Sequence, residues 1–328
     1  MDQRSFFHSF PRPRGETVAD AMKKGLRVLE LVMNFGLILA PETVVWRLPQ
    51  VDGTDREIEV EMCRICFTEL GETELPAHSE RFGAFALEFS ISRLRQMGAL
   101  PVIYMPQSVS ADQGFSNAGS LLVAMLGHVK YTLDQLENLR RHTDEEWVKA
   151  NVVGATSIQD DAVFDLRNTN DSGSISATYK IPMNTTRDLL AFVGFQNAPM
   201  WMLRNSLEFL ENLFYPTDNE ESEELLVYYR QREWRIAPGL SVDGSTLERE
   251  LTVEEKCRVI EVAPDFWTHE IRRRGISLRR IDAAKIIDHL DGRPVHEQIC
   301  SVIVPAGALD DAKRIVNGRI PVRVLNLV

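Results

Sequence analysis

Alternating apolar and polar residues mark several short segments of the chain as strands. Such runs, or short apolar runs bounded by turn residues, predict early strands over 5–10, 44–48, 57–67, 84–89 and 101–106. Apolar residues at helical spacing predict a helix over 18–35, with Thr17 as its N-cap and Gly36 as its stop. Gly25 inside this helix indicates a break or close packing, since glycine costs a helix about 1 kcal/mol relative to alanine.

The middle of the chain is mainly helical in pattern, and strand signals return after it. Helical spacing predicts helices over 91–97, 120–147, 186–195 and 199–214, with loop and short strands over 151–180. The last third predicts strands over 222–239, 256–264, 299–305 and 320–325, and helices over 281–290 and 308–317. Strands that cluster early and late around a helical middle favour an α+β fold over alternating β/α units.

This order of elements predicts a core that is interrupted by an insertion. We expect residues 1–110 to form the N-terminal α/β half of the core and 111–215 a mainly helical insertion. Residues 216–328 are expected to supply the strands and helices that complete the core. A chain of 328 residues is long enough to bury a sizeable core in this way.

Composition and charge narrow the class of protein. The formal net charge of −11 and a pI near 5.2 argue against a general nucleic-acid or membrane-surface binder. No apolar run approaches the roughly 20 residues of a membrane span, and the N-terminus lacks the apolar centre of a signal peptide. A cytoplasmic protein is therefore expected. The basic segment 270–280 is interpreted as a solvated helix face, with RNA or an acidic partner as the alternative.

The four cysteines are interpreted as core residues of a protein in a reducing compartment. Cys63 and Cys66 form a C-x-x-C, a pattern that also occurs in zinc and redox sites. Because the surrounding residues alternate like a strand, the two thiols are expected on opposite faces, and no metal site is predicted. The signatures of P-loop, Rossmann, zincin and α/β-hydrolase sites are missing from the sequence.

The predicted strand over 222–239 carries an unusual row of polar side chains. Its alternation places Tyr229, Gln231, Glu233 and Arg235 on one face. A buried carboxylate must be paired or hydrogen-bonded, because an isolated charge in an apolar interior is very costly. Two interpretations follow: a structural ion pair between Glu233 and Arg235, or a ligand site.

Short motifs in a fixed order resemble those of one protein family. They are His8, 66-CFTEL-70, His78 with Phe82 and Gly83, 101-PVIY-104 and 229-YRQREWRIAP-238. In order and spacing these pieces, spread over roughly residues 5 to 240, resemble the AbiGi-type abortive-infection proteins of bacterial phage defence. The resemblance implies antiviral defence as one half of a toxin–antitoxin pair, described for the family as the antitoxin. A protein partner encoded nearby is therefore expected.

A second resemblance concerns the residues that surround a ligand-binding cleft in another class of fold. An early strand histidine, a middle aromatic residue and a late [QE]-x-E strand are similar to ADP-ribosyltransferase-like folds, which implies two packed, mainly antiparallel sheets. In such folds the histidine contacts ribose, the aromatic residue stacks on nicotinamide and the last glutamate holds the ribose 2′-hydroxyl. The residues carried over are Glu233 and Gln231 for catalysis, and His8, His78, Phe82, Tyr229 and Arg235 for binding NAD⁺.

The candidate site residues and the two resemblances leave two classes of function open. A fixed carboxylate would stabilise the positive charge that develops on ribose when the glycosidic bond of NAD⁺ breaks. The first class is therefore an NAD-dependent ADP-ribosyltransferase or glycohydrolase. The second is a non-catalytic antitoxin or sensor that binds a partner toxin, in which His8, His78 and 231-QRE-233 are packed structural residues.

Overall fold

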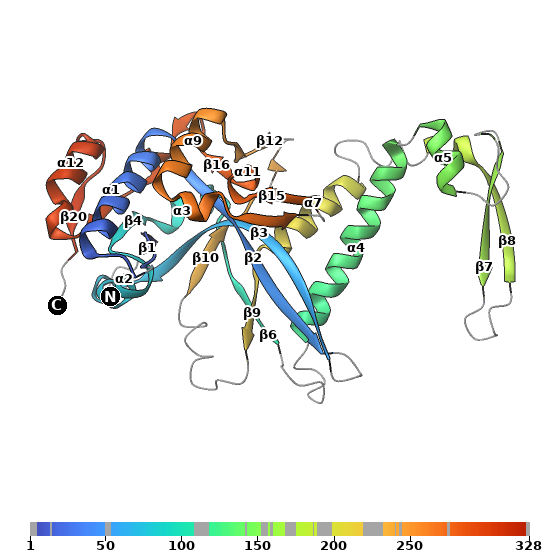
Figure 1. The fold of residues 1–328 in the computed structure, drawn as a ribbon, viewed down its shortest axis with the longest axis horizontal. Coiled ribbons are helices and arrows are strands. Elements are labelled where there is room, and N and C mark those ends of the chain that lie inside the picture. Colours follow the sequence, from blue (N-terminus) through green and yellow to red (C-terminus); the bar gives the residue numbers. More distant parts are fainter. Residues whose placement is uncertain are drawn as a thin grey trace. The chain divides into compact units, whose positions relative to one another are not determined.

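The computed structural model divides the chain into two compact units (Figure 1). Unit 1 comprises residues 1–123 and 209–328, and unit 2 comprises residues 124–208. The residues that the structure describes are 5–13, 15–49, 54–107, 118–141, 143–151, 157, 160–167, 175–185, 187–188, 199–218, 232–239, 241–242, 245–273 and 276–325.

Unit 1 combines helices with a large sheet, so the prediction of an α+β fold is confirmed. Its longer strands are β1 (Ser5–Phe10), β2 (Leu37–Pro49), β3 (Asp55–Leu70), β4 (Phe85–Phe89), β6 (Ile103–Gln107), β9 (Phe214–Asp218), β10 (Glu233–Ile236), β14 (Glu270–Arg273), β15 (Ile276–Arg279), β16 (Lys285–Ile287), β19 (Ser301–Val304) and β20 (Val322–Val324). Its two-residue strands are β5 (Leu100–Pro101), β11 (Ser241–Val242), β12 (Ser245–Thr246), β13 (Arg249–Glu250), β17 (His289–Leu290) and β18 (Arg293–Pro294). Its helices are α1 (Val18–Asn34), α2 (Leu75–Phe82), α3 (Ile91–Gln96), α9 (Val253–Val262), α10 (Pro264–Trp267), α11 (Arg280–Ala283) and α12 (Leu309–Val316).

Within the described residues, ten strands of unit 1 form a single sheet. Its main path runs β13–β16–β2–β3–β1–β4–β19–β20, with β10 paired to β3 and β5 paired to β10. The β19–β20 pair is parallel, and the other pairs of this sheet are antiparallel. The prediction of two packed sheets is therefore wrong. Strands from both ends of the sequence join one ladder because β4 pairs with β1 on one edge and with β19 on the other.

The long strand β3 pairs with three other strands. Residues Asp55 to Arg64 pair with β2, residues Ile65 to Thr68 pair with β10, and residues Thr68 to Leu70 pair with β1. Thr68 is opposite both Phe7 and Glu233, so β1 and β10 lie on opposite edges of β3. Because a strand has only two edges, β2 must share an edge of β3 with either β1 or β10. Strand β3 therefore changes its pairing partner along that edge beyond Arg64.

Helix α1 packs on the sheet as the sequence predicts. The Thr17 hydroxyl accepts a hydrogen bond from the Asp20 amide, and the helix ends before Gly36, whose φ is +124°. Gly25 marks close packing rather than a break, because a Cβ there would lie 2.4 Å from the ring of Phe85. The helix lies beside α9 and α12 in Figure 1, so segments distant in sequence cover the same part of the sheet.

Several predicted elements differ from those observed. Most of the predicted strand over 256–264 lies in helix α9, which Thr252 and Glu255 begin with a capping box. The predicted helix over 281–290 is only the short α11, because Lys285 to Ile287 then pair with β2. The basic segment 270–280 contains the hairpin β14–β15, so its interpretation as a helix face is wrong. The predicted helix over 120–147 is divided between α4 (Ala118–Arg141) and α5 (Asp144–Asn151).

Unit 2 holds most of α4, α5, the hairpin of β7 (Asp161–Arg167) and β8 (Ile175–Pro182), and most of α7 (Pro199–Glu211). Within it, Arg204 on α7 pairs with Asp134 on α4 at 2.8 Å. The predicted helix over 186–195 lies largely outside the described residues. In the part of the chain that is described, no helix is both long and apolar enough to cross a bilayer.

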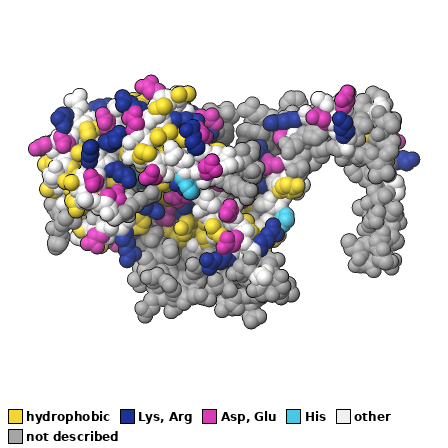
Figure 2. All heavy atoms as spheres, in the orientation of Figure 1, with side chains coloured by type: hydrophobic (Ala, Val, Ile, Leu, Met, Phe, Trp, Pro, Cys, Tyr) yellow, Lys and Arg dark blue, Asp and Glu magenta, His cyan; other side chains and the backbone are white. Residues whose placement is uncertain are grey.

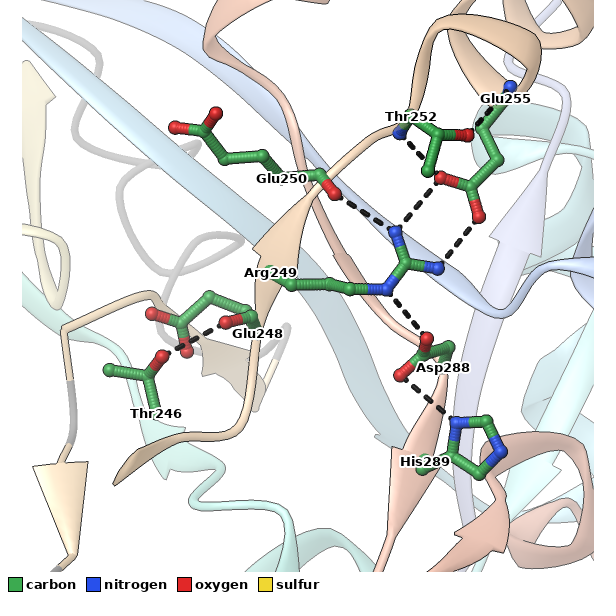
Figure 3. Close-up of polar contacts among 8 residues, drawn as sticks. All are labelled: Thr246, Glu248, Arg249, Glu250, Thr252, Glu255, Asp288 and His289. Atoms are coloured by element: carbon green, nitrogen blue, oxygen red, sulfur yellow. Dashed lines mark hydrogen bonds and ion pairs between the residues drawn. The ribbon is translucent and has the colours of Figure 1, made fainter. Parts of the chain in front are cut away.

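An arginine network joins three elements of unit 1 (Figure 3). The guanidinium of Arg249 on β13 donates from Nε to Oδ2 of Asp288, the residue just after β16, at 2.6 Å. It also binds both carboxylate oxygens of Glu255 on α9, at 2.9 and 2.7 Å. Hydrogen bonds from Arg249 lower the pKa of Glu255. Burial raises the pKa of Asp288, but Arg249 and His289 outweigh burial and lower it.

We predict that Arg249→Met lowers the free energy of unfolding by about 3 kcal/mol, because it leaves the buried Glu255 carboxylate without its counter-charge. The two carboxylates have lowered pKa values in the folded protein, so their contribution is complete above their ordinary pKa of about 4. It is lost as the pH falls through the lower folded-state values. Denaturant titrations of the wild type and of Arg249→Met from pH 7 to pH 2 should therefore show the difference between their unfolding free energies narrowing below about pH 4.

Arg314→Met is the matched control for this experiment. Arg314 pairs with Asp311 on α12, but its side chain is 78% exposed. An exposed ion pair contributes about 0–1 kcal/mol. An Arg249 variant no less stable than this control would show that the network does not stabilise unit 1.

Candidate functional site

A pocket of about 500 Å³ lies against the segment of β3 where its strand partners change. Its wall includes Arg64, Cys66 and Thr68 of β3, and side chains from β1, α1, β2, α2, β9, β10, α9 and α10. Sites for small molecules in proteins commonly measure about 300–1,000 Å³. The pocket is therefore large enough for a ligand of nucleotide size.

The pocket brings together five of the predicted site residues: His8, His78, Phe82, Glu233 and Arg235. His8 on β1 and Glu233 on β10 are more than two hundred positions apart in sequence. They meet because β1 and β10 flank β3, with strands in a sheet spaced about 5 Å apart. The other two predicted site residues, Gln231 and Tyr229, lie outside the described residues, as does the predicted strand before Arg232.

Glu233 and Arg235 form a buried ion pair on one face of β10. Arg235 Nε donates to Glu233 Oε1 at 2.8 Å, with the side chains 1% and 13% exposed. The second carboxylate oxygen, Oε2, accepts a hydrogen bond from the Tyr104 hydroxyl at 3.0 Å. Burial raises the pKa of Glu233, but the Arg235 guanidinium outweighs it, and the net pKa is lowered. Glu233 is therefore an ionised carboxylate whose two oxygens already have donors.

A second buried guanidinium lies beside this pair. Arg64 on β3 and Arg235 both approach the ring of Tyr215, with guanidinium carbons 5.3 and 5.0 Å from its centroid. Arg64 also pairs with Glu42 on β2 at 2.6 Å. Tyr215 in turn meets Tyr104 edge-on, with ring centroids 6.2 Å apart. The polar end of the pocket is thus a packed cluster of two arginines, two glutamates and two tyrosines.

Cys63 and Cys66 lie on a strand, as predicted, and their side chains diverge. The Cys66 thiol lines the pocket close to the Glu233 carboxylate. Burial, with the neighbouring carboxylate of Glu233, raises its pKa to about 12, so it remains a thiol at neutral pH. Cys63 instead donates to the Leu39 carbonyl at 3.3 Å. Within the described ranges, no group of three metal-ligating side chains was found.

Two histidines and an arginine, His8, His78 and Arg12, form another part of the pocket wall. His8 Nδ1 lies 2.8 Å from the Cys66 carbonyl, to which its N–H donates. His78 stacks on Phe82 with ring centroids 4.4 Å apart, and the guanidinium carbon of Arg12 lies 5.5 Å from the centroid of Phe82. Burial lowers the pKa of His8, and it lowers that of His78 to about 4. Both imidazoles are therefore neutral at pH 7.

The charge of the pocket is opposite to that of the chain. The described lining residues include four cations and two carboxylates, a formal charge of +2: Arg12, Lys24, Arg64, Arg235, Glu42 and Glu233. The whole chain carries −11. On the face shown in Figure 2, by contrast, the described basic and acidic side chains are interspersed. An anionic ligand would thus meet a locally favourable potential in the pocket.

Sequence reasoning missed four residues of this cluster: Arg64, Cys66 as a pocket residue, Tyr104 and Tyr215. A signal existed for Arg64, because it is a charge within the otherwise apolar run 62-MCRICF-67. No comparable signal marks Tyr215, which reaches the cluster through the parallel pairing of β6 and β9.

Comparisons with protein-family models, with curated proteins and with solved structures found no match to this chain. The geometry of the pocket is therefore the basis on which a function can be assigned.

We predict that Glu233→Gln lowers the free energy of unfolding by about 3–5 kcal/mol, because it leaves the fully buried Arg235 without a counter-charge. Tyr104→Phe is the matched control, since it removes one hydrogen bond to Glu233 and leaves the ion pair in place. A hydrogen bond to a charged group contributes about 1.5–3 kcal/mol, so the control should lose less. Denaturant unfolding measures both. Equal losses in the two variants would contradict a dominant role for the ion pair.

Proposed function

We propose that the pocket binds a dinucleotide of the NAD⁺ type, and that the chain acts through this binding as an antitoxin or sensor in bacterial abortive infection. The observation that carries the proposal is the state of Glu233. Its two carboxylate oxygens are engaged by Arg235 and Tyr104, and its charge is balanced inside the protein. Such a carboxylate can shape a site, but it is poorly suited to stabilising a new positive charge on ribose.

Three features of the pocket support a dinucleotide as the ligand. Its volume of about 500 Å³ suits a nucleotide-sized molecule. Aromatic side chains on its wall, among them the stacked pair of His78 and Phe82, provide flat surfaces against which a base can pack. Its described lining carries a formal charge of +2, which favours a ligand with phosphate groups.

The part in phage defence rests on the ordered motifs that resemble AbiGi-type proteins. Several of these motifs contribute to one site: His8, Cys66 of 66-CFTEL-70, His78 with Phe82, and Glu233 with Arg235 all line the pocket. Tyr104 of 101-PVIY-104 binds Glu233. The motifs are thus parts of one three-dimensional site, which supports a shared role. A protein partner encoded nearby is part of the same proposal.

ADP-ribosyl transfer or NAD⁺ hydrolysis is the second candidate function. The observation in its favour is that His8 and Glu233 line the same pocket from strands on either side of β3. In this case the ribose hydroxyl would have to replace Arg235 or Tyr104 as a donor to Glu233. The two candidates therefore differ in whether NAD⁺ is consumed.

We predict that NAD⁺ stabilises the purified protein and is not consumed. A ligand at 100 times its Kd raises the free energy of unfolding by about 2.7 kcal/mol. Thermal unfolding with and without NAD⁺ measures this effect, and nicotinamide release measures turnover. Phe82→Leu should weaken binding, because it keeps an apolar side chain but removes the aromatic face beside His78. Arg314→Met on α12, which does not line the pocket, is the control.

Each outcome separates the candidates. Nicotinamide release that is lost in a folded Glu233→Gln protein would favour the transferase. The absence of any NAD⁺-dependent stabilisation would contradict the dinucleotide proposal. Co-expression with the neighbouring gene tests the defence role, since an antitoxin should relieve that gene's toxicity and a pocket variant should fail to do so.

A further inference from the structure

The two buried arginines of the pocket differ in how far their hydrogen-bonding capacity is used. Arg235 donates from Nε to Glu233 at 2.8 Å and from Nη1 to the Asn212 carbonyl at 3.1 Å. Arg64 donates to one oxygen, Glu42 Oε2, and its Nη1 faces the Met62 sulfur at 3.0 Å. The Nε of Arg64 is buried and has no hydrogen-bond partner among the described residues.

Such incomplete pairing is costly for a buried cation. The Arg64 side chain is 5% exposed, whereas that of its partner Glu42 is 37% exposed and so partly in contact with solvent. A thioether is a weak acceptor. A buried donor without an acceptor has lost its hydrogen bonds to water without replacing them, and the cost is greater for a charged group. Arg64 therefore holds a positive charge at the pocket wall that the protein itself compensates only in part.

Two further features of the pocket point to a ligand that supplies the missing acceptor. Ser9 also lines the pocket, and its buried hydroxyl has no partner within the described part of the chain. The described pocket lining has an excess of two positive charges in a chain of charge −11. A guanidinium pairs best with planar or tetrahedral anions such as carboxylate and phosphate.

We propose that Arg64 anchors an anionic group of the ligand, and that the pocket selects phosphate-bearing molecules over uncharged molecules of similar shape. The inference rests on the proposed dinucleotide site and names the part of the ligand that is recognised. Arg64, rather than Arg235, takes this role because Arg235 is already paired with Glu233 and holds Asn212. Glu42 then competes with the ligand for Arg64, so removing the Glu42 carboxylate should strengthen binding, whereas removing Arg64 should weaken it.

The experiment measures binding by calorimetry to the full chain and to two variants. The probes are NAD⁺, ADP-ribose and pyrophosphate, with adenosine as the phosphate-free probe and succinate as the carboxylate probe. Arg64→Met should weaken the binding of the phosphorylated probes by roughly 10- to 100-fold, the range for a hydrogen bond to a charged group. Glu42→Gln should tighten the same binding, because it removes the carboxylate that competes for Arg64.

The effect of Glu42→Gln separates anchoring from a structural role. If Arg64 only supports the fold, losing Glu42, its ion-pair partner among the described residues, cannot improve binding. Unchanged or weaker binding in Glu42→Gln therefore overturns the inference. Should Arg64→Met fail to fold, Arg64→Lys keeps the charge but not the guanidinium geometry, and weaker phosphate binding is again expected. Arg314→Met is the control for loss of one positive charge elsewhere in unit 1.

The probes also distinguish this inference from the proposed function. Equal affinity for adenosine and ADP-ribose would overturn phosphate selection while leaving a nucleotide site in place. Binding of pyrophosphate that depends on Arg64, without binding of NAD⁺, would support the anchor and contradict the dinucleotide. If only succinate binds, the pocket recognises carboxylate rather than phosphate, and the inference is overturned. No binding of any probe would overturn both.

Discussion

The pairing of strand β3 is the constraint on which the rest of unit 1 depends. A strand has two edges, yet β3 pairs with β2, β10 and β1 along its length. Thr68 is opposite Phe7 on one edge and Glu233 on the other, which brings the two chain segments of unit 1 to the same strand. The pocket lies where the partner changes, at Arg64 to Thr68. The sheet thus creates the site as well as supporting it.

Charge burial explains why the polar end of the pocket is organised as it is. A buried ion must be compensated nearby, because the protein interior screens charges less than water does. Arg235 and Glu233 compensate each other, and Tyr104 and Asn212 satisfy further hydrogen bonds of the pair. Arg64 is compensated only in part. One arginine is therefore committed to structure, and the other remains available to a ligand.

The same geometry favours binding over catalysis as the role of the pocket. A catalytic carboxylate gains its effect from charge that is free to act on the transition state. At Glu233 that charge is already paired with Arg235, and the Tyr104 hydroxyl donates a further hydrogen bond to it. The histidines are neutral because burial lowers their pKa values. These features favour a recognition site whose selectivity comes from fixed donors, acceptors and aromatic faces.

Local patterns in the sequence determined several elements of the structure. Thr17 and Gly36 bound α1 because capping and a positive φ depend on neighbouring residues alone. The period of two along a strand likewise placed Glu233 and Arg235 on one face, and it separated Cys63 from Cys66. Only the tertiary structure decided the single sheet, the change from helix to strand at Lys285, and the meeting of Arg64 with Tyr215. Those features depend on pairing between segments far apart in the chain, and local periodicity carries no information about which distant strand supplies the partner.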